Sequence, residues 1–219
     1  MLNTVIFDMD GLLIDSEPCW QEAGMETMQR FNVKLTNEQY HNSTGLRTSE
    51  WIDHWFTHFN IDMKYAAEAE QTIVAAAINK IKAKARPLPG VQHIINFFRQ
   101  QQFKIGIASS SPMELINVVT GLLEIDNWVT ARASAENLPY GKPHPLVFLN
   151  CAELLHSNPT DCICFEDSFN GMIAAKAARM KCVVVPAYEQ QQHNKWSAAD
   201  LKISSLQNFN GLLLDSLTK

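Results

Sequence analysis

The segment from residue 4 to residue 17 reads TVIFDMDGLLIDSE. Its first four residues, Thr4 to Phe7, are all β-branched or aromatic, which predicts a short buried strand. The strand leads into Asp8 and Asp10, and Gly11 follows. Taken alone, Asp-x-Asp-Gly is typical of an ordinary turn. In an open parallel sheet, however, ligands bind outside the carboxyl ends of the strands, so carboxylates at this place are also a candidate site.

A block of helical patterns follows this segment. The helices are expected at Glu17–Phe31, Thr48–Phe59 and Tyr65–Lys84. No strand pattern separates them, and two prolines and a glycine within Arg86–Gly90 predict a sharp boundary after them. We therefore expect an all-helical domain at residues 17–86, inserted into a core that comprises residues 1–16 and 87–219.

Strand and helix patterns alternate after residue 90. The strands are expected at Lys104–Ala108, Val129–Ala133, Cys162–Phe165, Cys182–Val185 and Leu201–Ile203. Such alternation implies right-handed crossovers and a parallel sheet with helices on both faces. The predicted fold class is therefore α/β, with a Rossmann-like parallel-sheet core and a small inserted all-helical domain.

The composition argues against several classes of partner. The chain has 219 residues, a formal net charge of −5 and no basic block, so we expect it to bind neither nucleic acid nor an anionic membrane surface. No apolar run approaches the roughly 20 residues that a membrane span needs. A small molecule is the expected ligand, and the chain is expected to be monomeric.

The cysteines and the N-terminal residues bear on location. The five cysteines are odd in number and none forms a Cys-x-x-Cys pair, so we interpret them as reduced, mostly buried thiols. Met1 to Thr4 lead directly into the first strand, without the basic and long apolar regions of a secretory signal. We therefore expect a cytoplasmic protein.

Three later segments place further polar groups at strand ends or before a helix. They are Ser109-Ser110-Ser111, Gly141-Lys142-Pro143 and Glu166-Asp167-Ser168. Each has a structural explanation: a serine before Pro112 can cap a helix, a loop lysine is ordinarily solvated, and acids favour a helix N-terminus. We expect Ser111 to be such a cap. Clustered acids repel one another unless a hard cation lies among them, and ligands that are all oxygen suit Mg²⁺.

The four motifs, in this order, resemble those of the haloacid dehalogenase-like hydrolases over the whole chain. The helical insertion is similar to the small cap that covers the site in the branch containing phosphoglycolate phosphatases and β-phosphoglucomutase. The residues that flank the motifs resemble those of family members that act on hexitol phosphates and 2-deoxyglucose 6-phosphate. The resemblance implies a phosphatase of small sugar phosphates.

The resemblance also implies a role for each motif residue. Asp8 would be the nucleophile that carries the phosphoryl group, and Asp10 would be the general acid and base. Ser109 and the backbone N–H of Ser110 would bind phosphate oxygens, while Lys142 would neutralise charge on Asp8 and on the transferring group.

The resemblance further implies a Mg²⁺ site and a set of substrate contacts. The expected metal residues are Asp8, Asp10 through its backbone carbonyl, Asp167 and, in a supporting role, Glu166. The expected substrate contacts are Gly11, Leu12, Glu17, Trp20, Arg47, Ser110 and Asn170. For Arg47, an ordinary surface arginine is the alternative. Trp51 and Trp55 are expected to pack within the helical domain, with a sugar platform as the alternative.

Two other functions are compatible with these motifs. A β-phosphoglucomutase-like mutase shares the nucleophile and the acid/base, but Trp20 stands where that enzyme has a cap-side histidine. A non-catalytic module that binds sugar phosphates could use the same fold, although the motif residues Asp8, Asp10, Lys142 and Asp167 are all intact.

Overall fold

A six-stranded parallel sheet forms the centre of the computed structural model, which describes residues 1–41, 43 and 45–218. The strands are β1 (Thr4–Phe7), β2 (Lys104–Ser109), β3 (Ala131–Ser134), β4 (Cys162–Glu166), β5 (Lys181–Val184) and β6 (Leu201–Lys202). Their order in the sheet is β3-β2-β1-β4-β5-β6, and every neighbouring pair is parallel. The expected α/β, Rossmann-like fold is confirmed, with strand ends within two residues of those expected.

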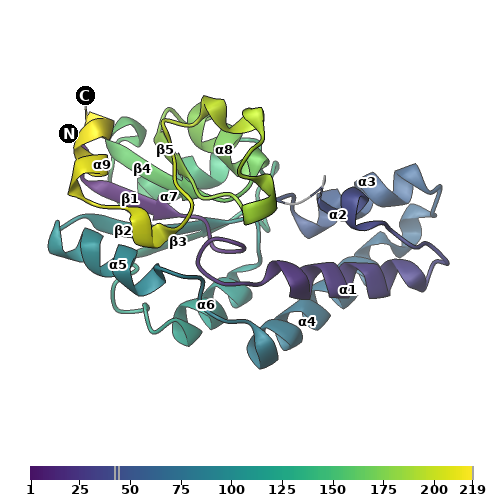
Figure 1. Cartoon of the computed structure of the whole chain (residues 1–219). Helices are drawn as coiled ribbons and strands as arrows, with labels where there is room; N and C mark the ends of the chain where they lie inside the picture. Colours follow the sequence, from purple (N-terminus) through teal and green to yellow (C-terminus); the bar gives the residue numbers. More distant parts are fainter. Residues whose placement is uncertain (42, 44, 219) are drawn as a thin grey trace.

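Helices cover both faces of the sheet (Figure 1). They are α5 (Val91–Gln100), α6 (Met113–Leu122), α7 (Leu146–Leu154), α8 (Phe169–Ala177) and α9 (Gly211–Thr218). Alternate residues of β1 explain this layering: Val5 and Phe7 pack in a cluster with α5 and α6, whereas Ile6 packs in a second cluster with α7 and α8. Both faces of β1 are buried, and Val5, Ile6 and Phe7 accordingly form an unbroken apolar run after Thr4.

The helical segment, as we call α1 to α4, extends away from the sheet (Figure 1). Its elements are α1 (Glu17–Gln29), α2 (Asn37–His41), α3 (Thr48–His58), the short 3₁₀ turn Met63–Tyr65 and α4 (Ala66–Lys84). Helix α4 packs against both α1 and α3. The segment has an apolar cluster of its own, which includes Met28, Phe56 and Ile73. This cluster packs the helices against one another, while Cys19 of α1 and Ile81 of α4 belong to the cluster that packs on the sheet.

Helix α2 was not expected from the sequence. It has only five residues, which is too short to show a helical period. The residues that begin it form a reciprocal pair: the Thr36 hydroxyl accepts from the Gln39 backbone N–H at 3.2 Å, and the Gln39 side chain accepts from the Thr36 N–H at 2.9 Å. This capping box is a signal that the sequence carried.

Two stretches of chain join the helical segment to the core, and they lie side by side. The N–H of Asp15 donates to the carbonyl of Arg86 at 2.9 Å, and the N–H of Leu88 donates to the carbonyl of Leu13 at 3.1 Å. The chain therefore enters and leaves the helical segment at one place, directly after the Asp8 and Asp10 motif.

The structure bears on two further expectations from the sequence. All five cysteines are buried and free of disulfide bonds, as expected; they are Cys19, Cys151, Cys162, Cys164 and Cys182. Within the described ranges, no helix has the length and apolar character that crossing a membrane requires.

Candidate active site

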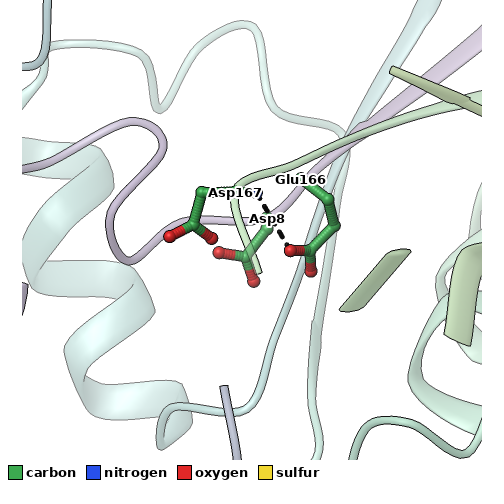
Figure 2. Close-up of side chains that lie close together, drawn as sticks. All are labelled: Asp8, Glu166 and Asp167. Carbon is green, nitrogen blue, oxygen red and sulfur yellow. Dashed lines mark hydrogen bonds between the residues drawn. The ribbon is translucent and has the colours of Figure 1, made fainter. Parts of the chain in front are cut away.

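The strand order brings three of the sequence motifs to one edge of the sheet. Strand β1 lies between β2 and β4, so Asp8 after β1 is flanked by Ser109 at the end of β2 and by Glu166 at the end of β4. The N–H of Asp8 continues the sheet by donating to the carbonyl of Phe165 at 2.9 Å. In Figure 2 the carboxylates of Asp8, Glu166 and Asp167 lie close together. One oxygen of each lies within 4.8 Å of the others.

Lys142 lies under this group of acids and is only 2% exposed. Its ammonium donates to Asp8 Oδ1, to Glu166 Oε1 at 2.6 Å and to the carbonyl of Ala108 at 3.1 Å. Burial lowers the pKa of Lys142, but attraction to Asp8 and Glu166 outweighs it and raises the pKa above its ordinary value. Lys142 therefore remains a cation and neutralises part of the negative charge around it.

Glu166 is fully buried, and both of its oxygens are occupied. Oε1 accepts from Lys142, while Oε2 accepts from the N–H of Asp167 at 3.1 Å and from the N–H and hydroxyl of Ser168 at 3.0 and 2.9 Å. A Cβ at Gly171 would lie 1.8 Å from Glu166 Oε1, so the start of α8 can approach the carboxylate only with glycine there. Glu166 thus fixes Lys142 and the Asp167 backbone, which agrees with a supporting role.

Four donors surround the carboxylate of Asp10. Oδ1 accepts from Ser16 Oγ at 2.6 Å and from Trp20 Nε1 at 2.9 Å, and Oδ2 accepts from Ser111 Oγ at 2.7 Å and from Ser109 Oγ at 3.3 Å. The donors come from the loop after β1, from α1 and from the loop after β2. They fix the orientation of the Asp10 side chain between the core and the helical segment.

The serine loop after β2 corrects one expectation. Ser111 does not cap α6: the helix begins at Met113 after Pro112 without a side-chain cap, and the Ser111 hydroxyl donates to Asp10 instead. Ser109 Oγ accepts from the Ser111 N–H at 3.0 Å. Ser110 donates to the carbonyl of Gly45 at 3.0 Å, which ties this loop to the helical segment. Proline has already fixed the start of α6, so Ser111 is free for the site.

The acids fit a small divalent cation. Burial raises the pKa of Asp8 and of Asp167 well above the ordinary value for aspartate; Lys142 offsets part of this, and neighbouring carboxylates add to it. A Cβ at Gly11, whose φ is +73°, would lie 2.3 Å from Asp167 Oδ2, so only glycine lets the loop after β1 approach the Asp167 carboxylate this closely. Buried carboxylate oxygens around an open space form the kind of ligand set that Mg²⁺ prefers.

A cavity of about 90 Å³ lies above these groups. The core contributes one wall, which includes Asp8, Asp10, Ser109, Ser110, Ser111, Lys142 and Asp167. The helical segment contributes the other, which includes Glu17, Trp20, Gly24, Tyr40, Trp51 and Ile73. Burial raises the pKa of Glu17 to about 7, with Asp10 and Asp15 adding to the rise and Tyr40 opposing it. The cavity therefore has an anion-rich floor and a largely aromatic roof.

Some of the expected substrate contacts line the cavity, and the others lie outside its wall. Glu17, Trp20 and Ser110 line the cavity. Gly11 lies beside Asp167, and the Leu12 side chain is buried in the apolar cluster under β1 rather than in the cavity wall. Asn170, near the start of α8, lies beside Gly45.

Arg47 differs from its expected role as a substrate-facing cation. Its guanidinium donates to the carbonyls of Ala135 and Leu138 in the core and to Glu50 Oε1 at 2.9 Å. The side chain lies outside the cavity wall, and Glu50 neutralises its charge. Arg47 therefore holds the start of α3 to the core.

Sequence reasoning missed several residues of the site. Ser16 and Ser111 contact Asp10, and Tyr40 and Trp51 line the cavity. Trp51 packs in the apolar cluster of the helical segment, as expected, but it also faces the cavity. Ser16 and Ser111 lie next to motifs that the sequence analysis recognised, and this proximity was the signal that could have placed them in the site.

Comparison with known proteins gives a consistent result. The family model for haloacid dehalogenase-like hydrolases matches residues 5–185. Hexitol phosphatase B of Escherichia coli K12 is 40% identical over 202 residues, which are 92% of this chain and 91% of that protein. A β-phosphoglucomutase structure from Clostridium difficile has a TM-score of 0.88 at 23% identity, covering 100% of this chain and 98% of that one. CbbY from Rhodobacter sphaeroides, in complex with phosphate, has a TM-score of 0.87 at 20% identity, covering 100% of both chains. At these identities the two structures show the fold alone.

Proposed function

The chain belongs to the haloacid dehalogenase-like hydrolase family and is a phosphatase, and from this premise we propose that it is a Mg²⁺-dependent phosphomonoesterase of small sugar phosphates that uses a phosphorylated aspartate, Asp8. One observation carries the proposal. A buried Asp8 carboxylate accepts a hydrogen bond from Lys142 and lies beside Asp167 in the wall of a cavity. This is a nucleophile with a fixed cation and room for a substrate.

In the first step a carboxylate oxygen of Asp8 attacks phosphorus, and the bond from phosphorus to the leaving oxygen breaks. The ionised carboxylate needs no deprotonation, and the buried Lys142 ammonium favours that ionised form. The same ammonium stabilises charge that develops on the phosphoryl oxygens. Ser109 Oγ and the N–H of Ser110 are the candidate donors for those oxygens.

Asp10 has the general acid and base role. It donates a proton to the leaving oxygen and then accepts a proton from the water that hydrolyses the phosphorylated Asp8. The four donors around its carboxylate keep it at the boundary between the two walls of the cavity, where a leaving group would lie. This placement gives Asp10 access to a substrate bound between core and helical segment.

Members of this family generally use Mg²⁺. Asp8, Asp167 and the backbone carbonyl of Asp10 are the candidate ligands, and Glu166 supports them through Lys142 and the Asp167 N–H. When bound, Mg²⁺ supplies a positive charge that neutralises the phosphoryl group and the crowded carboxylates. Asp167 has no role in this account apart from the metal, so its loss should change the Mg²⁺ requirement first.

The substrate class rests on the similarity to hexitol phosphatase B and on the cavity. Hexose and hexitol phosphates, with 2-deoxyglucose 6-phosphate among them, are the proposed substrates. The cavity has polar and aromatic groups opposite the phosphate site, a combination that suits a hydroxylated chain.

A panel of phosphate esters tests the proposal. Phosphate release is measured from hexose, hexitol, nucleotide and glycolate phosphates with Mg²⁺ and again with excess chelator. We expect release from hexose or hexitol phosphates that chelation abolishes, and an Asp167→Asn variant that needs a higher Mg²⁺ concentration for half-maximal rate. Isomerisation of a sugar phosphate without phosphate release would favour a mutase. Binding without turnover of any ester would favour a regulatory module.

A further inference from the structure

Apart from Arg47 Nε and Arg132 Nε, whose side chains do not line the cavity, two buried polar atoms have no hydrogen-bond partner among the described residues, and both belong to side chains that line the cavity. They are Glu17 Oε2, an acceptor, and Trp51 Nε1, a donor. A buried donor or acceptor that stays unpaired destabilises the folded state, so such atoms usually have a partner. Because both side chains line the cavity, a ligand in it is the candidate partner for both atoms.

The position of Trp51 is rigid. Its ring contacts Tyr40 and Trp55 edge to face, with centroids 6.3 and 6.4 Å away. On the α1 side, a Cβ at Gly24 would lie 3.1 Å from Trp51 Cη2, so glycine lets the helix approach the ring closely. A fixed donor on an aromatic ring is preorganised for one direction of approach.

The charge at this end of the cavity has one sign. Glu17 and Asp167 both lie against Gly11, because a Cβ there would lie 3.4 Å from Glu17 Cγ and 2.3 Å from Asp167 Oδ2. The two carboxylates are therefore close neighbours at this end of the cavity, which Asp10 also lines. The nearby cation Arg47 is paired with Glu50 and lies outside the cavity wall, and Lys142 is engaged by Asp8 and Glu166. A second anionic group on a substrate would face Glu17 without a balancing charge.

We propose that Glu17 and Trp51 form a subsite for hydroxyl groups, which selects phosphomonoesters of neutral polyols or sugars over esters that carry a second anion. A substrate hydroxyl donates to Glu17 Oε2, and the same or a neighbouring hydroxyl accepts from Trp51 Nε1. A hydroxyl has one donor and two acceptor positions, so a vicinal pair can satisfy both atoms. The inference rests on the proposed phosphatase function and specifies its substrate.

The Trp51→Phe variant tests the donor, because it keeps an aromatic ring and removes the N–H. We measure kcat/KM for sorbitol 6-phosphate and for hexyl phosphate, which has the same chain length without hydroxyls. The ratio of the first to the second is expected to fall about fivefold, the worth of one hydrogen bond of about 1 kcal/mol. The matched control is Trp55→Phe on the same helix, whose indole donates to Ser43 Oγ instead. The control should keep the ratio within about twofold of the wild type.

The Glu17→Gln variant tests the acceptor and its charge. The ratio of kcat/KM for 2-phosphoglycolate to that for sorbitol 6-phosphate is expected to rise at least about threefold, because the repulsion of a second anion is removed. An unchanged ratio in both Trp51→Phe and Glu17→Gln would overturn the subsite while leaving phosphatase activity in place. If the wild type hydrolyses no ester, the proposed function fails instead. In that case the dissociation constant of sorbitol 6-phosphate is measured by calorimetry for the wild type and for Trp51→Phe. Binding about fivefold weaker in Trp51→Phe would support the subsite, and equal binding would overturn it.

Discussion

Replacement of Glu17 by glutamine should stabilise the protein increasingly as the pH rises. The folded chain raises the pKa of Glu17 from 4.5 to about 7, first through burial and then through Asp10 and Asp15. Between these two pH values the folded state binds more protons at Glu17 than the unfolded state does. The free energy of unfolding therefore falls through this window as pH increases and becomes level above about pH 7.5. Glutamine does not titrate, so the variant lacks this loss.

The size of the effect follows from the two pKa values. The full difference corresponds to about 3 kcal/mol, and the part that lies between pH 5 and pH 8 is about 2 kcal/mol. We expect the free energy of unfolding of Glu17→Gln, relative to the wild type, to be about 2 kcal/mol higher at pH 8 than at pH 5. Any effect of the amide that does not depend on pH cancels in this difference.

The assay is urea unfolding at both pH values with excess chelator, followed by circular dichroism and by tryptophan fluorescence, whose transitions must coincide. Glu38→Gln, at an exposed position of α2, controls for the loss of one acidic residue. Its stability relative to the wild type should change by only a few tenths of a kcal/mol between the two pH values. The reasoning is refuted if Glu17→Gln behaves like this control.

Three further predictions concern the catalytic groups. Asp8→Asn should abolish turnover while circular dichroism and thermal unfolding remain those of a folded protein; appreciable activity in a preparation free of host phosphatases would contradict the nucleophile. Lys142→Met should lower the free energy of unfolding by about 3–5 kcal/mol at pH 8, because buried Asp8 and Glu166 lose their common cation. The loss should be smaller at pH 5, because burial raises the pKa of Asp8 and favours its protonation there; equal losses in urea unfolding at both pH values would argue against an ionic origin. Asp10→Asn should slow hydrolysis of sugar phosphates by about 10²–10⁴-fold and that of p-nitrophenyl phosphate much less, and equal slowing of the two substrates would remove leaving-group protonation from its role.

Much of the core could be predicted from the sequence because its elements have strong local patterns. The β1 strand consists of β-branched and aromatic residues. The rule that ligands bind at the carboxyl ends of strands predicted that Asp8, Ser109 and Glu166 lie together. The structure confirms that convergence. Helix α2 was not predicted because five residues are too few to show a helical period, although Thr36 and Gln39 form a capping box. The expected monomeric state and cytoplasmic location stay predictions.

The roof of the cavity was harder to predict, because it depends on contacts between residues that are distant in sequence. Helical spacing places Trp51 on a buried face but cannot show that this face borders a cavity. Arg47 was expected to face substrate, yet the carbonyls that it contacts belong to residues 135 and 138, which are 88 and 91 positions away. Ser111 follows the pattern of a helix cap, and only the approach of Asp10 reveals its other use.

The central claim is that Asp8 carries the phosphoryl group. Enzyme in excess over a hexitol phosphate is quenched in acid during turnover, and the peptide that contains Asp8 is analysed by mass spectrometry, before and after reduction of acyl phosphate with borohydride. The account predicts a phosphoryl group on Asp8, which accumulates and decays with phosphate release and is absent from Asp8→Asn. Phosphate release without any phosphorylated Asp8 at any quench time, together with turnover by Asp8→Asn, would contradict it.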